Sequence, residues 1–389
     1  MKNRKNLNFL VYLAVFFIPF YLIKVKIGLF PINFLEIIIG VIFLVWFFGD
    51  RKKDDIKNFF YEYEKYIFFL GFIFFGLVMS TFLNRNHMQS LGIIKSWFLI
   101  PLVLFFLIEK IVDKRKISNI FTAYLLSASC VALISLMFFG LTYDKRLAGI
   151  FNSPNYLAMY LSPALIIITE NQFFCRSKIK YFLIFICLAS ILIAFYLTYS
   201  YAAWFSVMFS FGILLLIKKE ISIKKTLIAG VFFLMFFSQL NSSKMLNLIS
   251  ADSRSSLASR IMIWRSSVKI LEDNFIFGIG PGNFQEKYLE YQKFYPPYLE
   301  WAVPHPNNLY LALWLSGGLA GFFAFFGIVI LFFRDVLISL RIKKEPEQKI
   351  IIMALGIMLT ILIHGIFDTT YFKNDLAIIF WLNFLVLKL

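Results

Sequence analysis

The sequence predicts an all-α polytopic membrane protein with about 12 transmembrane helices and a large external loop subdomain between spans 9 and 10. Three observations lead to this fold class. The chain of 389 residues is 60% hydrophobic and only 16% charged, and it contains 50 Phe, which is far from the composition of soluble globular domains. Its apolar residues form runs that approach the roughly 20 residues a helix needs to cross a bilayer. One long polar segment, residues 241–308, interrupts these runs.

The predicted spans begin close to the N-terminus. The first apolar run, residues 7–23, follows Lys2, Arg4 and Lys5 and resembles a signal sequence. No small-x-small cleavage site follows it, so we interpret it as a span. The other apolar runs lie near residues 32–48, 66–83, 91–108, 119–141, 156–169, 181–199, 201–217, 226–240, 308–333, 350–366 and 376–388. Together these runs give twelve predicted spans.

The distribution of basic residues predicts the orientation of these spans. Alternate connectors and the two termini carry 25 of the 39 Lys and Arg residues, and the positive-inside rule places them in the cytoplasm. The polar segment 241–308 then faces outward. We therefore predict three parts: residues 1–240 with spans 1–9, residues 241–307 as an external loop subdomain with an interfacial helix, and residues 308–389 with spans 10–12.

Charge and cysteine content exclude several classes of protein. A net charge of +17 would suggest nucleic-acid binding in a soluble protein, but here the basic residues lie in short clusters between apolar runs. We expect no nucleic-acid partner. Cys130, Cys175 and Cys187 lie in or beside apolar runs, so they predict neither a disulfide framework nor a metal site. The outer segment has no DxD-type acidic pair, and we expect no metal and no cofactor.

The outer segment contains a predicted helix and a predicted turn. Five apolar residues recur at helical spacing and predict an amphipathic helix at the membrane interface: Leu257, Ile261, Trp264, Val268 and Leu271. Arg260, close to this stripe, is either a snorkelling arginine or a bidentate clamp on a lipid-linked diphosphate. The glycines of GIGPG, residues 278–282, predict a tight turn, because no strand and no GK[ST] accompany them.

Several motifs in a fixed order carry a resemblance to a known family. They are KRLAGIFNSPNYLAMYL, YLTYSYAAW, SR-x3-W followed by GIGPGNF, PHPNNLYLALWLSGGLAG and HGIFDTTYF. Together they resemble the O-antigen ligase and O-antigen polymerase superfamily of bacterial polysaccharide biosynthesis, over most of the chain from Arg146 onward. The resemblance implies a metal-independent glycosyltransferase of the cell envelope. Such an enzyme moves a glycan from an undecaprenyl diphosphate carrier to an acceptor hydroxyl at the outer face of the bacterial cytoplasmic membrane.

The resemblance also implies roles for individual residues. Arg260 and Arg146 would bind the diphosphate, whose charge grows as it departs. Two positions differ from the family: Tyr201 stands where an arginine is usual, and Asn307 stands where the histidine base is usual. Asn is not a general base, so His305, two residues earlier, would be the catalytic base if the loop turns its ring inward. The alternative is a loop histidine whose ring is satisfied by the backbone.

Further polar residues are predicted to contact the substrate. They are Tyr201, Asn307, Asn308 and Asn155. For Asn155, a turn that starts the next span is the alternative. For Arg146, the alternative is a surface ion pair with Asp144. These alternatives stay open in the sequence.

Two charged positions in apolar runs also need an explanation. His364 and Asp368 lie four residues apart, and we favour a hydrogen bond on one helix face over a catalytic dyad. Lys95 is a buried charge in a membrane context, which indicates either a functional site or a side chain that snorkels outward beside Trp97.

The expected partners are the undecaprenyl diphosphate-linked glycan donor, a glycan, lipid or protein acceptor, and membrane lipids. Ligase and polymerase differ only in the acceptor, which the sequence does not identify. A lipid-linked oligosaccharide flippase or other transporter is an alternative, although such proteins often show inverted repeats and midplane polar groups. A catalytically inactive relative that binds the carrier is another alternative, favoured by Tyr201 and Asn307.

Overall fold

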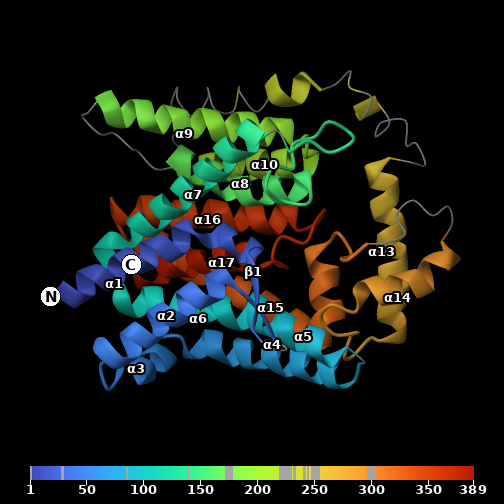
Figure 1. Ribbon diagram of the computed structural model, residues 1–389, viewed down its shortest axis with the longest axis horizontal. Coiled ribbons are helices and arrows are strands. Elements are labelled where there is room, and N and C mark those ends of the chain that lie inside the picture. Colours follow the sequence, from blue (N-terminus) through green and yellow to red (C-terminus); the bar gives the residue numbers. More distant parts are fainter. Residues whose placement is uncertain are drawn as a thin grey trace.

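The protein is described by a computed structural model as a bundle of long helices with a smaller helical part at one end (Figure 1). The described residues are 2–27, 30–84, 86–138, 140–170, 178–218, 230, 234–239, 242, 245–246, 255–295 and 303–389. The bundle helices are α1 (Lys2–Phe16), α2 (Phe34–Gly49), α4 (Glu64–Phe82), α5 (His87–Ile93), α6 (Ile100–Ile111), α7 (Ile117–Phe138), α8 (Pro154–Glu170), α9 (Lys178–Leu197), α10 (Tyr201–Lys218), α15 (Leu309–Ile342), α16 (Glu347–His364) and α17 (Asn374–Leu382).

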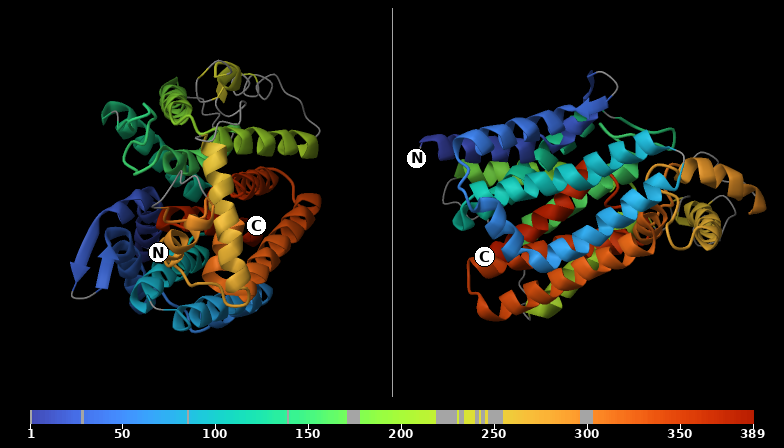
Figure 2. Two further views of the ribbon diagram at one scale, coloured as in Figure 1. Left: turned by 90° about the vertical axis from the view of Figure 1, so that its right-hand side faces the viewer. Right: turned by 90° about the horizontal axis from the view of Figure 1, so that it is seen from below.

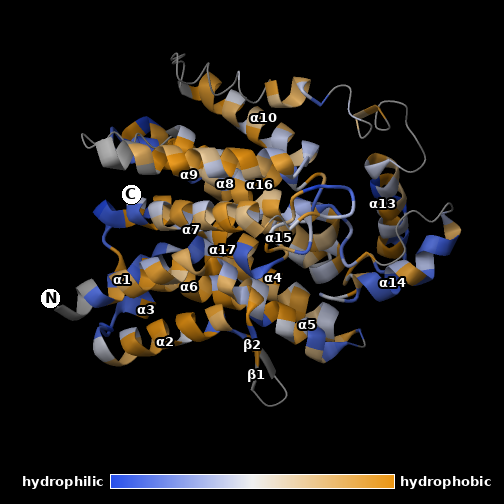
Figure 3. Cartoon of the chain, turned by 45° about the horizontal axis from the view of Figure 1, so that its top comes forward, coloured by the Kyte–Doolittle hydropathy of each residue, from blue (hydrophilic) through white to orange (hydrophobic). Residues whose placement is uncertain are grey.

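The helical membrane architecture predicted from the sequence is confirmed in its main features. Among the residues that the structure describes, five helices are long and apolar enough to cross a membrane: 64–82, 87–111, 114–138, 309–342 and 347–364. Shorter apolar helices lie at 6–16, 34–49, 154–169, 184–197 and 201–217. Figure 3 shows hydrophobic residues along the bundle helices and hydrophilic residues at the helix ends. The predicted span 226–240 falls mostly outside the described residues, so the number twelve stays a prediction.

A short hairpin between the first two bundle helices was not predicted. Strands β1 (Lys24–Ile27) and β2 (Phe30–Asn33) pair antiparallel. Each strand is only four residues long, too short for alternation to distinguish it from a loop. Asn33 ends the hairpin and starts α2. Its side chain accepts a hydrogen bond from the backbone N–H of Glu36 at 2.9 Å and thereby caps the helix.

The GIGPG turn is fixed to a kink in the longest bundle helix. At Gly318 the backbone of α15 has a φ of 61°, and a Cβ there would lie 2.2 Å from the carbonyl oxygen of Ile276. Only glycine fits this conformation and this approach. The kink frees backbone groups: Ile279 N–H donates to the Leu315 carbonyl at 2.7 Å, and Leu319 N–H donates to the Ile276 carbonyl at 2.9 Å. The turn is thereby joined to the bundle.

The described part of the polar segment forms helices α13 (Ser256–Asp273) and α14 (Phe284–Tyr291). Figure 2 shows α13 crossing one end of the bundle. The helix predicted from apolar spacing is therefore confirmed, but part of that stripe does not pack on the protein: Leu257, Ile261 and Val268 are exposed, whereas Met262 and Ile263 are buried. The outward stripe is as expected for an interfacial helix. The external position of this segment and the predicted domain boundaries stay predictions.

Candidate functional site

A cavity of about 300 Å³ lies between α13 and the bundle. We call it the arginine cavity. Its polar wall consists of Arg146, Asn155, Ser200, Tyr201, Ser256 and Arg260. Its apolar wall consists of Ala202, Phe205, Phe236, Leu257 and Phe367. The structure thus brings together four residues predicted from the sequence, although they come from segments far apart in the chain: Arg146, Asn155, Tyr201 and Arg260.

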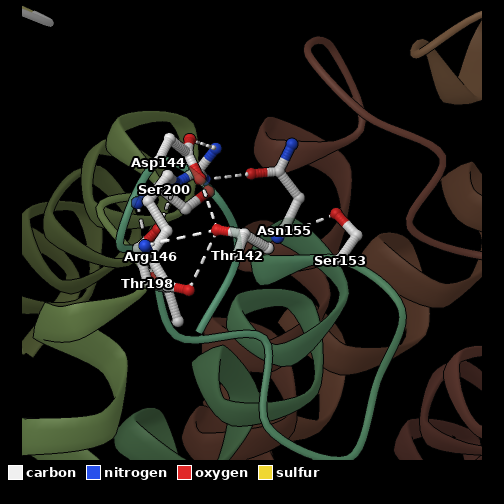
Figure 4. Close-up of polar contacts among 7 residues, drawn as sticks. All are labelled: Thr142, Asp144, Arg146, Ser153, Asn155, Thr198 and Ser200. Atoms are coloured by element: carbon white, nitrogen blue, oxygen red, sulfur yellow. Dashed lines mark hydrogen bonds and ion pairs between the residues drawn. The ribbon is translucent and has the colours of Figure 1, made fainter. Parts of the chain in front are cut away.

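Arg146 is held in place by the segments around it (Figure 4). Its Nε donates to the Thr198 carbonyl at 2.8 Å, and its Nη2 donates to the Asn155 Oδ1 at 2.8 Å. The Asp144 carboxylate lies 3.8 Å from Nη1. The ion pair with Asp144 is therefore present, but the Arg146 side chain is only 16% exposed, so this is not a surface arginine. Burial lowers the pKa of Arg146, Asp144 opposes this effect, and the charge of Arg260 adds to it.

Arg260 reaches the same cavity from α13. Its Nε donates to the Phe367 carbonyl at 2.9 Å. One helical turn further, the Trp264 indole donates to the Asn307 carbonyl at 3.2 Å. These two bonds join α13 to the loops that precede α15 and α17. Within the described part of the chain, no hydrogen bond or ion pair occupies the terminal nitrogens of Arg260, which leaves its fork available to an anion.

His305 is partly buried, and its ring points inward. The ring centroid lies 5.8 Å from that of Trp97 and 6.4 Å from that of Phe372. Burial lowers the pKa of His305 to about 4, the Asp368 carboxylate opposes this shift, and Lys373 adds to it. The imidazole is therefore neutral at pH 7. It lines a neighbouring cavity of about 20 Å³ rather than the arginine cavity.

The two asparagines after His305 have mainly structural contacts. Asn307 adopts a left-handed conformation, with a φ of 48°, and its carbonyl accepts the bond from Trp264. Asn308 caps α15: its Oδ1 accepts from Leu311 N–H at 2.9 Å, and its Nδ2 donates to the Ile366 carbonyl at 2.8 Å. Neither asparagine is among the described residues that line the arginine cavity. Their predicted substrate contacts stay untested.

Tyr201 takes the place of the arginine that the resemblance implied. It begins α10 and lines the arginine cavity, where its hydroxyl lies 3.1 Å from the Ser242 Oγ. A phenol donates one hydrogen bond and carries no charge at neutral pH. The cavity wall at this point is therefore polar but uncharged.

Asp368 lies in a loop and not on the helix face that its spacing from His364 predicted. Helix α16 ends at His364, so Asp368 belongs to the following loop. The predicted hydrogen bond between them forms through the backbone, where Asp368 N–H donates to the His364 carbonyl at 3.0 Å. The His364 Nε2 has no partner among the described residues. Asp368 is buried and accepts a bond from Thr369 N–H at 3.0 Å. Its charge acts on both His305 and Arg146, against the larger effect of burial on each pKa.

Asp368 also lies close to a further cation. Burial lowers the pKa of Lys373, while Asp375 and Asp368 oppose that shift. The Lys373 ammonium lies 3.2 Å from the centroid of the Tyr156 ring. The HGIFDTTYF motif drew attention to this loop in the sequence. Residue spacing alone did not show that the Asp368 carboxylate faces residues from other segments.

Lys95 is explained by an ion pair. Its ammonium lies 2.7 Å from the Glu36 carboxylate, and the Ser96 hydroxyl donates to the other oxygen of Glu36 at 2.5 Å. Glu36 is 5% exposed at its side chain. The two charges offset one another's burial, so Lys95 does not by itself indicate a site.

The described residues contain no cluster of metal ligands. No three His, Cys, Asp or Glu side chains lie together there in a way that could hold a metal ion. Cys130 and Cys187 are free thiols, and Cys175 lies outside the described residues. Metal independence stays a prediction.

Comparison with known proteins supports the resemblance read from the motifs. Residues 184–326 match the O-Antigen ligase family. The match confirms the resemblance to the O-antigen ligase and polymerase superfamily. An uncharacterized protein of Haemophilus influenzae is 27% identical over 355 residues, which cover 85% of this chain and 85% of that relative.

The O-antigen ligase match covers part of the site. It includes Tyr201, Arg260 and His305, as well as the start of α15. Arg146 precedes the matched residues, and Asp368 follows them. The structure therefore adds, to the segment that matches the O-Antigen ligase family, side chains from two regions that the match does not contain.

Proposed function

We propose that the protein is a glycosyltransferase that transfers or polymerises an undecaprenyl diphosphate-linked glycan onto an acceptor hydroxyl, at the outer face of the bacterial cytoplasmic membrane. The observation that carries the proposal is the arginine cavity, where two guanidinium groups and a set of apolar side chains share one space. The O-antigen ligase match supports the same class of substrate.

The two walls of the arginine cavity suit a lipid with a charged headgroup. Phe205 is 49% exposed, and Phe236 and Leu257 are 36% and 37% exposed, so these apolar surfaces are open to a ligand. Arg146 and Arg260 lie on the polar side. An isoprenoid chain would pack on the apolar wall while its diphosphate meets the guanidinium groups, because Arg pairs with phosphate oxygens in a bidentate manner.

The arginines would act on the leaving group. As the bond between the anomeric carbon and the diphosphate oxygen breaks, negative charge grows on the departing undecaprenyl diphosphate. Arg146 is already fixed by Thr198 and Asn155, so it needs little reorganisation when this charge develops. Guanidinium groups would thus supply the stabilisation without a metal.

His305 would take the proton of the acceptor hydroxyl. Its lowered pKa of about 4 keeps the ring neutral at pH 7 and able to accept a proton. The hydroxyl oxygen then bonds to the anomeric carbon as the diphosphate leaves. The Asp368 carboxylate would stabilise the protonated imidazole, since it acts to raise the His305 pKa. Substrate binding must bring the acceptor within about 3 Å of the ring.

The direct test is transfer in vitro. Purified protein in lipid nanodiscs would receive a synthetic undecaprenyl diphosphate glycan and a panel of acceptors, with and without a chelator. We expect transfer in both conditions. A glycan acceptor linked to the same carrier would indicate a polymerase, and any other acceptor would indicate a ligase.

Variants of His305 and Asn307 test the role of His305 as the general base. His305→Ala should lower turnover at least about a hundredfold, the lower end of general-base contributions, with little change in carrier binding. The paired exchange His305→Asn with Asn307→His recreates the family arrangement and should restore part of the activity. Full activity in His305→Ala would exclude this residue as the base.

Two results would favour the alternatives. Carrier binding without transfer, for wild type and for the paired exchange with every acceptor, would indicate an inactive carrier-binding relative. Movement of the lipid-linked glycan between leaflets of sealed vesicles, without transfer, would indicate a flippase.

A further inference from the structure

A second cavity, of about 180 Å³, lies at the end of the bundle opposite α13. Helix α3 (Asp55–Glu62) marks this end in Figure 1. We call it the aromatic cavity, because its wall includes Phe59, Tyr63, Tyr66, Phe105, Trp381 and Phe384. The last five of these are 1–7% exposed. The cavity therefore enters the packed helices and is not a shallow groove on the lipid-facing surface.

The edge of the aromatic cavity is charged. The Lys110 ammonium lies 5.6 Å from the centroid of the Phe59 ring, and it pairs with Glu109 at 2.9 Å and with Glu62 at 3.5 Å. Lys388 is held nearby, since its ammonium donates to the Val112 carbonyl at 3.0 Å. The two carboxylates at this edge are therefore already matched by cations.

Three further cations follow directly. Residues Lys114, Arg115 and Lys116 form the short 3-10 turn between α6 and α7, and all three are exposed. We call them the basic turn. No ion pair involves any of them within the part of the chain that the structure describes. Asp113 directly precedes the basic turn, so residues 113–116 keep an excess of positive charge, close to the end of the helix that carries Lys110.

We propose that the aromatic cavity binds one acyl chain of an anionic glycerophospholipid whose phosphate lies against the basic turn. An apolar wall excludes a polar ligand, because unpaired polar groups there would be desolvated. A zwitterionic lipid would gain little from the basic turn, whereas an anionic headgroup gains from each nearby Lys or Arg. The site lies at the other end of the bundle from the arginine cavity, so it does not depend on the proposed function.

The experiment uses Trp381, which lines the aromatic cavity and is 4% exposed. The full-length protein would be reconstituted in phosphatidylcholine vesicles that contain a small fraction of brominated lipid, whose acyl chain quenches tryptophan on contact. The Trp381 contribution is the fluorescence of wild type minus that of Trp381→Phe, which keeps an aromatic ring and most of the volume. We expect brominated phosphatidylglycerol to quench this contribution several-fold more strongly than brominated phosphatidylcholine does.

Two variants separate the chain from the headgroup. Neutralising the basic turn with Lys114→Gln, Arg115→Gln and Lys116→Gln should remove the preference for phosphatidylglycerol. Each Lys or Arg that lies near an anionic headgroup raises the affinity for that lipid by up to about fivefold. Leu102→Phe places a larger side chain in the cavity wall and should abolish quenching by both lipids. Circular dichroism and gel filtration of each variant would establish that it is folded.

Three outcomes would overturn the proposal. Absence of Trp381 quenching by any brominated lipid in folded protein would exclude an acyl chain. Equal quenching by the two brominated lipids would exclude the anionic preference. Relief of the quenching by undecaprenyl phosphate at concentrations where unbrominated phosphatidylglycerol has no effect would assign the cavity to an isoprenoid chain instead.

Discussion

Arg146 and Arg260 line one cavity, but the segments that carry them hold the two side chains differently. Arg146 lies in a loop and is bound by Thr198, Asn155 and Asp144. Arg260 lies on α13, and one bond from its Nε to the Phe367 carbonyl positions it. One arginine therefore contributes to the local structure as well as to the charge of the cavity. The other presents its guanidinium fork mainly to the cavity.

This difference separates two kinds of contribution to binding. A cation that the protein already holds in position needs little reorganisation when the substrate binds. Its removal, however, leaves its hydrogen-bond partners in the protein unpaired, which destabilises the fold. A cation with free donors can be changed with little effect on folding, and the loss then appears in substrate binding and turnover. The predictions below use this separation, beginning with the largest effect.

The largest effect is expected from Arg260→Lys. Lysine keeps the positive charge but offers a point charge in place of the bidentate fork. We expect turnover with the carrier-linked glycan to fall about a hundredfold, the lower end of the range found when one donor to a developing charge is removed. The melting temperature should change little. Transfer assays and thermal unfolding of the same preparation measure both quantities.

Arg265→Lys is the matched control for this prediction. Arg265 lies on the same helix and is exposed, and it is not among the described residues of the cavity wall. Its substitution should leave turnover close to that of wild type. Equal activity in Arg260→Lys, Arg265→Lys and wild type would remove the diphosphate role of Arg260 and would make the comparison with Arg146 irrelevant to catalysis.

Arg146→Lys should show a mixed effect. Lysine cannot donate to Thr198 and Asn155 together in the same planar geometry, and each acceptor left unpaired in a buried position costs about 1–3 kcal/mol. We therefore expect a lower melting temperature together with a roughly tenfold loss of turnover. Asn155→Ala is the companion variant, since it removes one partner and leaves the arginine. If Arg146→Lys changed turnover alone, with unfolding unaffected, the anchoring role would be wrong.

The sequence predicted which residues belong to this site better than it predicted their arrangement in space. Arg146, Tyr201 and Arg260 are each more than fifty residues from the next in the chain, and all three line the arginine cavity. Apolar runs predicted the helices, because a membrane demands long stretches of one polarity. The kink at Gly318 was not predicted, since it depends on a turn reached only in the folded chain.

The position of Asp368 shows the same limit. An i, i+4 spacing predicted a hydrogen bond with His364 on one helix face. The bond forms through the backbone, from Asp368 N–H to the His364 carbonyl at 3.0 Å, but α16 ends at His364, so the Asp368 side chain lies in a loop. Two of the residues on which Asp368 acts, His305 and Arg146, are distant in sequence. Spacing rules concern neighbours within one element, whereas this loop is positioned by bonds from α13 and from Asn308.

The pH dependence of transfer sharpens the comparison, because both arginines stay charged throughout the accessible range and His305 does not. A His305 pKa of about 4 in the free protein predicts that kcat/KM is nearly constant from pH 7 to 5.5. A pKa near 6.5 would instead give a loss of about tenfold at pH 5.5. The measurement is kcat/KM across this range, with an acid limb centred near 6.5 as the contrary result.

The same shift has a consequence for stability. The folded state holds His305 with a pKa of about 4, below the roughly 6.5 of an unfolded chain. Between these two values the unfolded state binds a proton that the folded state does not, so stability should fall as the pH is lowered from about 6.5 towards 4. His305→Ala should reduce this slope, as measured by thermal unfolding at a series of pH values.

The smallest effect is expected at Asn308, where sequence and structure suggest different roles. Its Oδ1 caps α15 and its Nδ2 binds the Ile366 carbonyl, so neither amide atom is free for a substrate without loss of a structural bond. Asn308→Ala should therefore cost about 1 kcal/mol of stability, the usual value for a lost N-cap, while kcat/KM stays within about twofold of wild type. Asn308→Ser retains a capping oxygen and should recover most of the stability. A large loss of activity in Asn308→Ser at wild-type stability would show instead that the side chain contacts the substrate, and the loop before α15 would then join Arg260 as part of the substrate-binding surface.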